Sequence, residues 1–156
     1  MTGKTHIMGG VASCTAVAYF YGYDPILMTA SGTLGALIPD ICHTKSKIGR
    51  RLPILSTLIS SIFGHRTFTH SLLFLLLTAF AAHLYLTDQS ILVGLMAGMA
   101  SHLLLDAGTT NGIKLFFPSS IKFRLPLYIK TGGKAEQAVL AALTILSCYF
   151  IAGLMA

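Results

Sequence analysis

Five long apolar segments alternate with short polar stretches along the chain, and this pattern predicts membrane-spanning helices. Each segment has about 15–22 residues, close to the roughly 20 that a helix needs to cross a bilayer. A sixth segment, Leu52–Gly64, has only about 13 residues, which favours a short interfacial or re-entrant helix. The five long segments are Ile7–Tyr23, Pro25–Pro39, Ser71–Leu86, Ser90–Ala107 and Ala135–Ala156. We therefore predict an all-α fold: a polytopic helical membrane bundle of about five transmembrane helices plus the short one.

Composition supports this prediction. Hydrophobic residues make up 54% of the chain and charged residues only 10%, whereas soluble domains are about 25% charged. An ordinary water-soluble globule and a disordered chain are both excluded. We expect a single integral-membrane domain of residues 1–156. The 3 cysteines are not clustered and indicate no disulfide framework.

All lysine and arginine residues fall on one side of the predicted helices. The turn around Asp24 and the turn around Asp88 contain none of the 11. The rest of the loops hold all of them, and basic loops remain in the cytoplasm. The pattern therefore predicts a cytoplasmic N-terminus and a C-terminus on the opposite side of the membrane.

Histidine and carboxylate residues gather at the same predicted end of the bundle. Only His83, Asp24 and Asp88 are predicted to lie toward the outer side, where the two aspartates suit turns. Ionisable groups near or inside spans are costly and usually have a function. Because the orientation follows from Lys and Arg alone, this gathering is an independent observation. The members are His6, Asp40, His43, His65, His70, His102, Asp106 and Glu136.

His102 and Asp106 form the sharpest local signal. Spaced i, i+4, they share one face of a helix, and Gly94 and Gly98 continue that face as a G-x-x-x-G stripe. Small residues let another helix approach closely, so this face is predicted to point into the bundle. A buried His–Asp hydrogen bond that only holds helices together is the alternative interpretation.

Imidazole and carboxylate groups together predict a metal centre. This donor set suits Zn²⁺ best, and Mn²⁺ or Fe²⁺ also fit. Three histidines (His6, His70 and His102) and three acids (Asp40, Asp106 and Glu136) are enough for one or two ions, and spacing does not choose between them. His65 and His70, five residues apart, cannot share one helical face.

These motifs together resemble the YdjM-type, LexA-regulated, membrane-bound metal-dependent hydrolases. The resemblance covers nearly the whole chain and is carried by four blocks: Thr5-His6 with Gly9, Leu-Gly-Ala-Leu-Ile-Pro-Asp40, His65-Arg-x-x-Thr-His70-Ser, and Ser-His102-x-x-x-Asp106. A late Lys-Thr-Gly-Gly-Lys-Ala-Glu136 also fits. The resemblance implies a multi-pass protein of the bacterial inner membrane with a place in the SOS response, so the C-terminus predicted on the outer side from Lys and Arg would be periplasmic. It also implies metal ligation by His6, Asp40, His65, His70, His102 and Asp106.

One departure from the family pattern concerns the segment after Pro39. The family often has Pro-Asp-x-Asp-His there, whereas this chain has Pro39-Asp40-Ile41-Cys42-His43. Either Cys42 replaces the second acid as a thiolate ligand, or one metal position is weaker. Whether Cys42 or His43 is a ligand therefore stays open.

These observations predict hydrolysis of an ester or phosphoester, with a membrane lipid among the candidate substrates. Asp106 or Glu136 is the predicted general base. Arg66, with Lys45, Lys47, Arg50 and Arg51, is expected to attract an anionic or phosphorylated substrate. Direct nucleic-acid binding is not expected. An ion- or proton-coupled transporter and a non-catalytic membrane regulator are the alternatives.

Overall fold

The computed structural model describes residues 1–63 and 67–156, so His65 and Arg66 lie outside the described part. The described residues are helical and contain no named strand, only two isolated β-bridges that join Thr109 to Ile129 and Ile113 to Phe123. The elements are α1 (Gly3–Tyr21), α2 (Pro25–Gly35), η1 (Ile38–Cys42), α3 (Pro53–Phe63), η2 (Phe68–His70), α4 (Leu72–Tyr85), α5 (Gln89–Ala107) and α6 (Lys134–Met155). The all-α prediction is therefore confirmed.

Polar side chains at the turns define where the helices begin. The Asp24 carboxylate accepts hydrogen bonds of 2.8 Å from the amides of Ile26 and Leu27 at the start of α2. Asp88 caps α5 in the same way. Both aspartates satisfy amides that the helix itself leaves unpaired. At α4 the cap is Ser71, whose hydroxyl accepts from the amide of Phe74.

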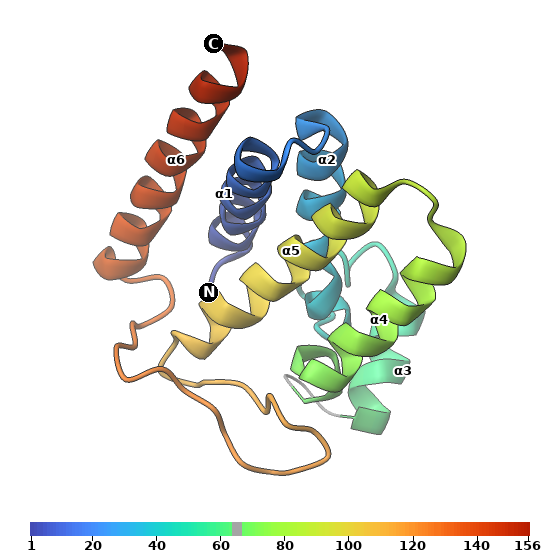
Figure 1. Cartoon of the computed structure of the whole chain (residues 1–156). Coiled ribbons are helices and arrows are strands. Elements are labelled where there is room, and N and C mark those ends of the chain that lie inside the picture. The colour runs from blue at the N-terminus through green and yellow to red at the C-terminus, as the bar shows by residue number, and fades with distance from the viewer. Residues whose placement is uncertain (64–66) are drawn as a thin grey trace.

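The centre of the molecule is built by α1, α2 and α5, while α6 packs along α1 and α4 lies beside α5 (Figure 1). Glycines make the closest approach possible. A Cβ atom on Gly94 would lie 2.6 Å from the carbonyl oxygen of Met28, and one on Gly98 would collide with the carbonyl oxygen of Gly32. The predicted inward orientation of this face of α5 is therefore confirmed.

We expect Gly98→Ala to destabilise the bundle, because its methyl group would overlap the backbone of α2. Overpacking of this kind costs about 1–3 kcal/mol. Gly3→Ala is the control, because a Cβ there meets only the Lys47 side chain, at 3.9 Å. Thermal unfolding in detergent should show a lower melting temperature for Gly98→Ala alone. Equal melting temperatures for the two variants would show that α2 and α5 separate readily.

The prediction of five transmembrane helices is not supported. Three stretches of the described residues are long and apolar enough to cross a membrane: Pro25–Cys42, Gln89–Ala107 and Lys134–Met155. The apolar segment at Ser71 forms the 14-residue helix α4, about 21 Å long at 1.5 Å per residue and shorter than a hydrocarbon core of roughly 30 Å. Although α1 has 19 residues, Lys4, His6 and several small polar residues lower its hydropathy. The segment after Leu52 forms the short helix α3, of 11 residues.

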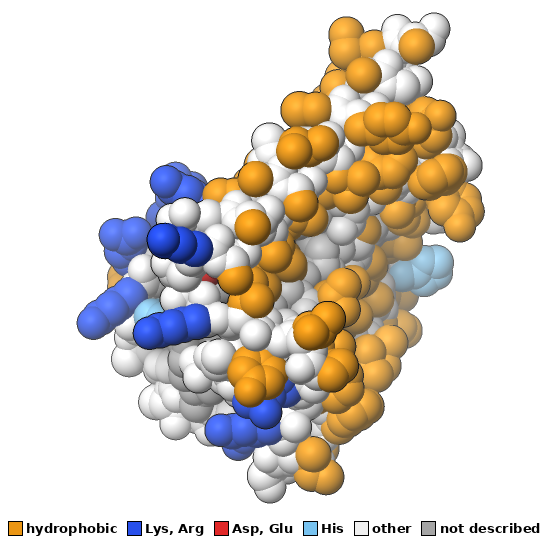
Figure 2. Space-filling model, turned by 90° about the vertical axis from the view of Figure 1, so that its left-hand side faces the viewer, with side chains coloured by type: hydrophobic (Ala, Val, Ile, Leu, Met, Phe, Trp, Pro, Cys, Tyr) orange, Lys and Arg blue, Asp and Glu red, His pale blue; other side chains and the backbone are white. Residues whose placement is uncertain are grey.

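Charged and apolar side chains occupy different parts of the surface. In Figure 2, Lys and Arg gather at the lower left of the face shown, whereas hydrophobic side chains cover its upper part and right-hand side. Leu76 and Phe80 of α4 and Ile145 and Tyr149 of α6 are among the exposed large hydrophobic residues. Exposed apolar surface of this extent is expected where lipid is the surrounding medium.

Candidate metal centre

Five predicted ligands come together from four separate elements. His6 projects from α1, Asp40 from η1, His70 from η2, and His102 and Asp106 from α5. Four of the five are at most 1% exposed, and Asp40 is the one that reaches the surface, with its side chain 19% exposed. Two overlapping groups of possible ligands result: His6, His102 and Asp106, and Asp40, His70 and His102. His102 belongs to both.

The distances between these side-chain atoms match those around one bound ion. The Nε2 atoms of His70 and His102 are 3.3 Å apart. They lie 3.5 and 3.8 Å from Oδ2 of Asp106, and 3.6 and 3.8 Å from Oδ1 of Asp40. A tetrahedral ion with bonds of about 2.0–2.2 Å holds neighbouring ligand atoms roughly 3.3–3.6 Å apart. A small divalent cation therefore fits between His70, His102 and either one of the two carboxylates with little rearrangement.

Hydrogen bonds outside the cluster fix two of the imidazole rings. Nδ1 of His102 lies 2.6 Å from the carbonyl oxygen of Ala36. Because a carbonyl only accepts, Nδ1 carries the proton, and the lone pair of Nε2 faces the cluster. Nδ1 of His70 lies 3.1 Å from the hydroxyl of Thr69, which leaves its Nε2 toward Asp40 and Asp106. Such outer contacts set the tautomer and orientation of metal-binding histidines.

His6 stacks on His102 and extends the site toward α1. The two ring centroids are 3.7 Å apart with an interplanar angle of 14°, and Nε2 of His6 lies 3.2 Å from Oδ1 of Asp106. Nδ1 of His6 is buried and has no hydrogen-bond partner within the described part of the chain. An imidazole nitrogen without a partner in a buried carboxylate cluster suits a cation, so His6 fits the donor set as a ligand.

The two carboxylates attract positive charge even without a metal. Desolvation lowers the pKa of His70, but hydrogen bonds with Asp106, Asp40 and Cys42 outweigh it and raise this pKa to about 10. The N-terminal ammonium group of Met1 also pairs with Asp106. A proton on His70 therefore balances part of the carboxylate charge in the metal-free chain, and metal binding would displace that proton.

Glu136 lies outside both groups of possible ligands, although the sequence placed it at the same end. Its Oε1 accepts hydrogen bonds of 2.5 Å from the amide of Thr2 and 2.6 Å from the hydroxyl of Thr5, and its Oε2 accepts one of 2.6 Å from the amide of Gly132. Glu136 thus ties the first turn of α6 to the first turn of α1, the helix that carries His6.

The remaining candidate residues have different surroundings. Cys42 is buried, hydrogen-bonds His70 and lies 3.6 Å from the carbonyl of Pro39, but neither it nor His43 belongs to the two groups. His43 accepts a hydrogen bond from the amide of Lys45. His83 is exposed on α4. His65 and Arg66 lie outside the described residues, so their predicted roles stay predictions.

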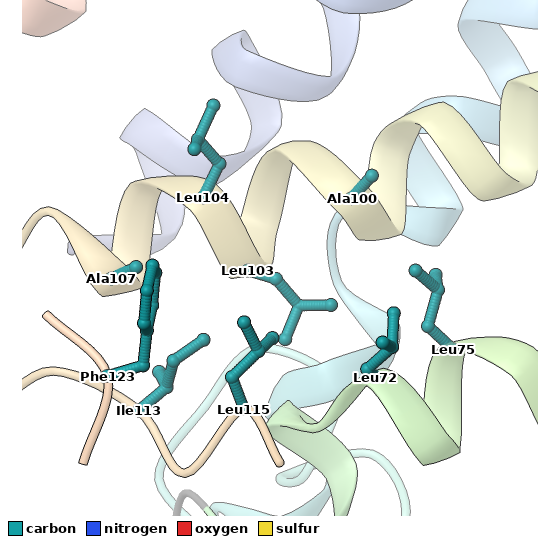
Figure 3. A pocket seen from close by; sticks show the side chains of 9 residues that line it. All are labelled: Leu72, Leu75, Ala100, Leu103, Leu104, Ala107, Ile113, Leu115 and Phe123. Carbon is teal, nitrogen blue, oxygen red and sulfur yellow. The ribbon is translucent and has the colours of Figure 1, made fainter. Parts of the chain in front are cut away.

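Sequence reasoning missed the groups that orient the cluster. Thr69, next to His70, could have been found from its position, and Thr5, next to His6, likewise. No sequence signal points to the carbonyl of Ala36. An apolar cavity of about 190 Å³ on another face of α5 was also missed (Figure 3). Leu103 and Ala107, beside His102 and Asp106, line it together with Leu72 of α4.

The fold and the site thus define a helical membrane protein with a buried histidine–aspartate cluster at one end. Comparison with known proteins gives its family: the YdjM inner membrane protein family matches residues 1–156, and the chain belongs to it. The Uncharacterized protein YvsG of Bacillus subtilis (strain 168) is 69% identical over 150 residues, which is 96% of this chain and 94% of that protein.

Two further relatives carry the family name. The Inner membrane protein YdjM of Escherichia coli (strain K12) and that of Shigella flexneri are each 35% identical over 162 residues, which covers 96% of this chain and 82% of each relative. No solved structure matches. The family predicted from the sequence motifs is confirmed, and with it the nature of the chain as a membrane protein.

Proposed function

We propose that this protein is a metal-dependent hydrolase of an ester or phosphoester, with its site at the cytoplasmic face of the membrane. The observation that carries the proposal is that the Nε2 atoms of His70 and His102 lie 3.3 Å from each other and 3.5–3.8 Å from carboxylate oxygens of Asp40 and Asp106. A divalent ion, most suitably Zn²⁺ with Mn²⁺ or Fe²⁺ as alternatives, would activate a water molecule and polarise the scissile group.

The side chains of the cluster have different roles in this proposal. His70, His102 and Asp106 are buried and would hold the ion, with His6 beside them against Asp106. Asp40 is partly exposed, so its carboxylate stands where substrate and water enter. Of the two predicted general bases, Asp106 lies in the cluster, whereas Glu136 already accepts three hydrogen bonds and acts in this proposal as a support.

Hydrolysis by the purified protein tests the proposal. The protein is stripped with a chelator in neutral detergent and reloaded separately with Zn²⁺, Mn²⁺ or Fe²⁺, then assayed with a carboxylic ester and with phosphoesters. Reloading with one of these ions should restore hydrolysis that Asp106→Asn lacks. If metal binds and no ester or phosphoester is cleaved, the cluster is a structural or regulatory site and the hydrolase proposal is wrong.

The orientation in the membrane is part of the proposal. The N-terminus and the basic loop Phe116–Thr131 lie at the end of the bundle where α6 begins, whereas the C-terminus lies at the far end of α6 (Figure 1). Under the positive-inside rule the basic end faces the cytoplasm.

We expect a reporter fused at the C-terminus to be active only outside the cytoplasm, and one inserted in Phe116–Thr131 to be active only inside. Alkaline phosphatase and a fluorescent protein that folds in the cytoplasm provide the two readouts. The reverse pattern would place the histidine–aspartate cluster at the outer face.

A further inference from the structure

A pocket lined by basic side chains opens onto the cluster at Asp40. Asp40 is the partly exposed member of the cluster, and it lines a pocket of about 410 Å³. Four cationic side chains line the same pocket: Lys4 at the start of α1, and Lys45, Lys47 and Arg50 from the segment after η1. A molecule that reaches Asp40 therefore meets a concentration of positive charge.

The segment after η1, which carries Lys45, Lys47 and Arg50, is held in place by its own hydrogen bonds. The Ser46 hydroxyl donates to the carbonyl of Asp40 at 2.8 Å and accepts from the amide of Gly49 at 2.9 Å. The Arg50 guanidinium donates to the carbonyl of Ser46 at 3.4 Å. The segment that carries three of the four cations is thus tied to Asp40 itself, so the charges are positioned relative to the cluster.

The charge balance of the pocket selects among ester substrates. Four cations face one partly exposed carboxylate, which leaves an excess that a neutral carboxylic ester does not use. A phosphodiester carries one negative charge, whereas a phosphomonoester carries about 1.5 to 2 at neutral pH, with three oxygens that accept hydrogen bonds. Lysine and arginine are the side chains that bind such oxygens most strongly.

We propose that this basic pocket binds the phosphate group of a phosphomonoester, an inference that rests on the proposed hydrolase function and names its substrate class. In the reaction, the oxygen of water forms the new bond to phosphorus and the ester P–O bond breaks. One proton of the water leaves with the alcohol and the other remains on the phosphate, so the products are an alcohol and inorganic phosphate. Lys45, Lys47 and Arg50 would hold the non-bridging oxygens.

The phosphomonoester has two possible sources, a lipid and a soluble metabolite. The apolar cavity between α4 and α5 lies next to His102 and Asp106 along α5 and has room for part of an acyl chain. Its lining is apolar, so it supplies no ligand to the phosphate. Assays with phosphatidic acid in mixed micelles and with p-nitrophenyl phosphate would distinguish the lipid source from the soluble one.

Binding of inorganic phosphate to the Zn²⁺-loaded protein, followed by calorimetry, is the readout that does not depend on turnover. The double variant Lys45→Gln/Lys47→Gln should weaken binding about two- to thirtyfold, because each exposed charge contact contributes about 0.2–1 kcal/mol. The control is Lys130→Gln/Lys134→Gln, which removes the same charge outside the pocket and should leave the affinity unchanged. Equal weakening in both double variants would overturn the proposal, because it would indicate general charge attraction.

Substrate comparison separates this proposal from the hydrolase proposal. Cleavage of a monoester in preference to bis(p-nitrophenyl) phosphate and to a carboxylic ester supports both. Preference for the carboxylic ester, with no phosphate binding, leaves the hydrolase and overturns the phosphate pocket. Phosphate binding that depends on Lys45 and Lys47 without any turnover leaves the pocket and overturns the hydrolase. Cleavage of phosphatidic acid but not p-nitrophenyl phosphate identifies the source as lipid, and the reverse identifies it as soluble.

Discussion

Replacing His102 with alanine is expected to abolish metal binding, because His102 is the residue shared by both groups of possible ligands. Loss of groups that merely orient a ligand already costs about 10–100-fold in affinity, so loss of this ligand should cost more than about 100-fold. Asp106→Asn should have a similar effect while keeping the size of the side chain. Metal content after dialysis, measured by mass spectrometry beside the yield of folded protein, checks this.

The same measurement discriminates among the histidines. His6→Ala and His70→Ala should also lower bound metal, whereas His83→Ala should not, because His83 is exposed on α4. Since α4 is continuous from Leu72 to Tyr85, His83 lies about 20 Å along the chain from His70 at 1.5 Å per residue. Loss of metal in His83→Ala with retention in His70→Ala would overturn the site. Wild-type protein that binds no supplied metal would show that the cluster only packs helices.

The pairing of His102 with Asp106 was predictable because a helix fixes the positions of residues i and i+4 relative to each other. The stripe of Gly94 and Gly98 showed which way that face points, since only a close neighbour requires two glycines there. Asp40 and His70 were predicted to join them from the charge pattern alone. Helix geometry and the one-sided distribution of Lys and Arg thus point to His6, Asp40, His70, His102 and Asp106, but the same argument also places His43 and Glu136 with them, which lie outside the two groups.

Other features depend on contacts that sequence spacing does not encode. The chain leaves α2 after Gly35 and turns into η1, where the amide of Asp40 bonds to the carbonyl of Leu37 at 3.2 Å. The carbonyl of Ala36 is thereby left available for His102, as helix ends leave carbonyls unpaired. Likewise, the apolar segment at Ser71 was predicted to span the bilayer although short for it, and its helix α4 runs only from Leu72 to Tyr85.

Glu136→Ala is the second change for which we expect a large effect, and it acts on stability. The buried carboxylate accepts hydrogen bonds from two backbone amides and the Thr5 hydroxyl. Alanine would leave the buried Thr5 hydroxyl without this acceptor, at a cost of about 1–3 kcal/mol, whereas the part-buried amides of Thr2 and Gly132 would lose theirs at a smaller cost. The free energy of unfolding should fall by about 2 kcal/mol or more, which thermal or denaturant unfolding in detergent would detect. Because α1 also carries His6, metal affinity should fall as well.

Two further variants separate this supporting role from general-base catalysis. Gln137→Ala changes the neighbouring exposed residue of α6 and should leave the melting temperature unchanged. Glu136→Gln keeps the size of the side chain and one carbonyl oxygen, and should retain part of the stability and of any turnover. A general base contributes about 10²–10⁴-fold to the rate. Glu136→Gln could instead melt like the wild type and bind metal normally but lose turnover by that factor. In that case Glu136 is the general base, and its three hydrogen bonds are those it makes in the absence of substrate.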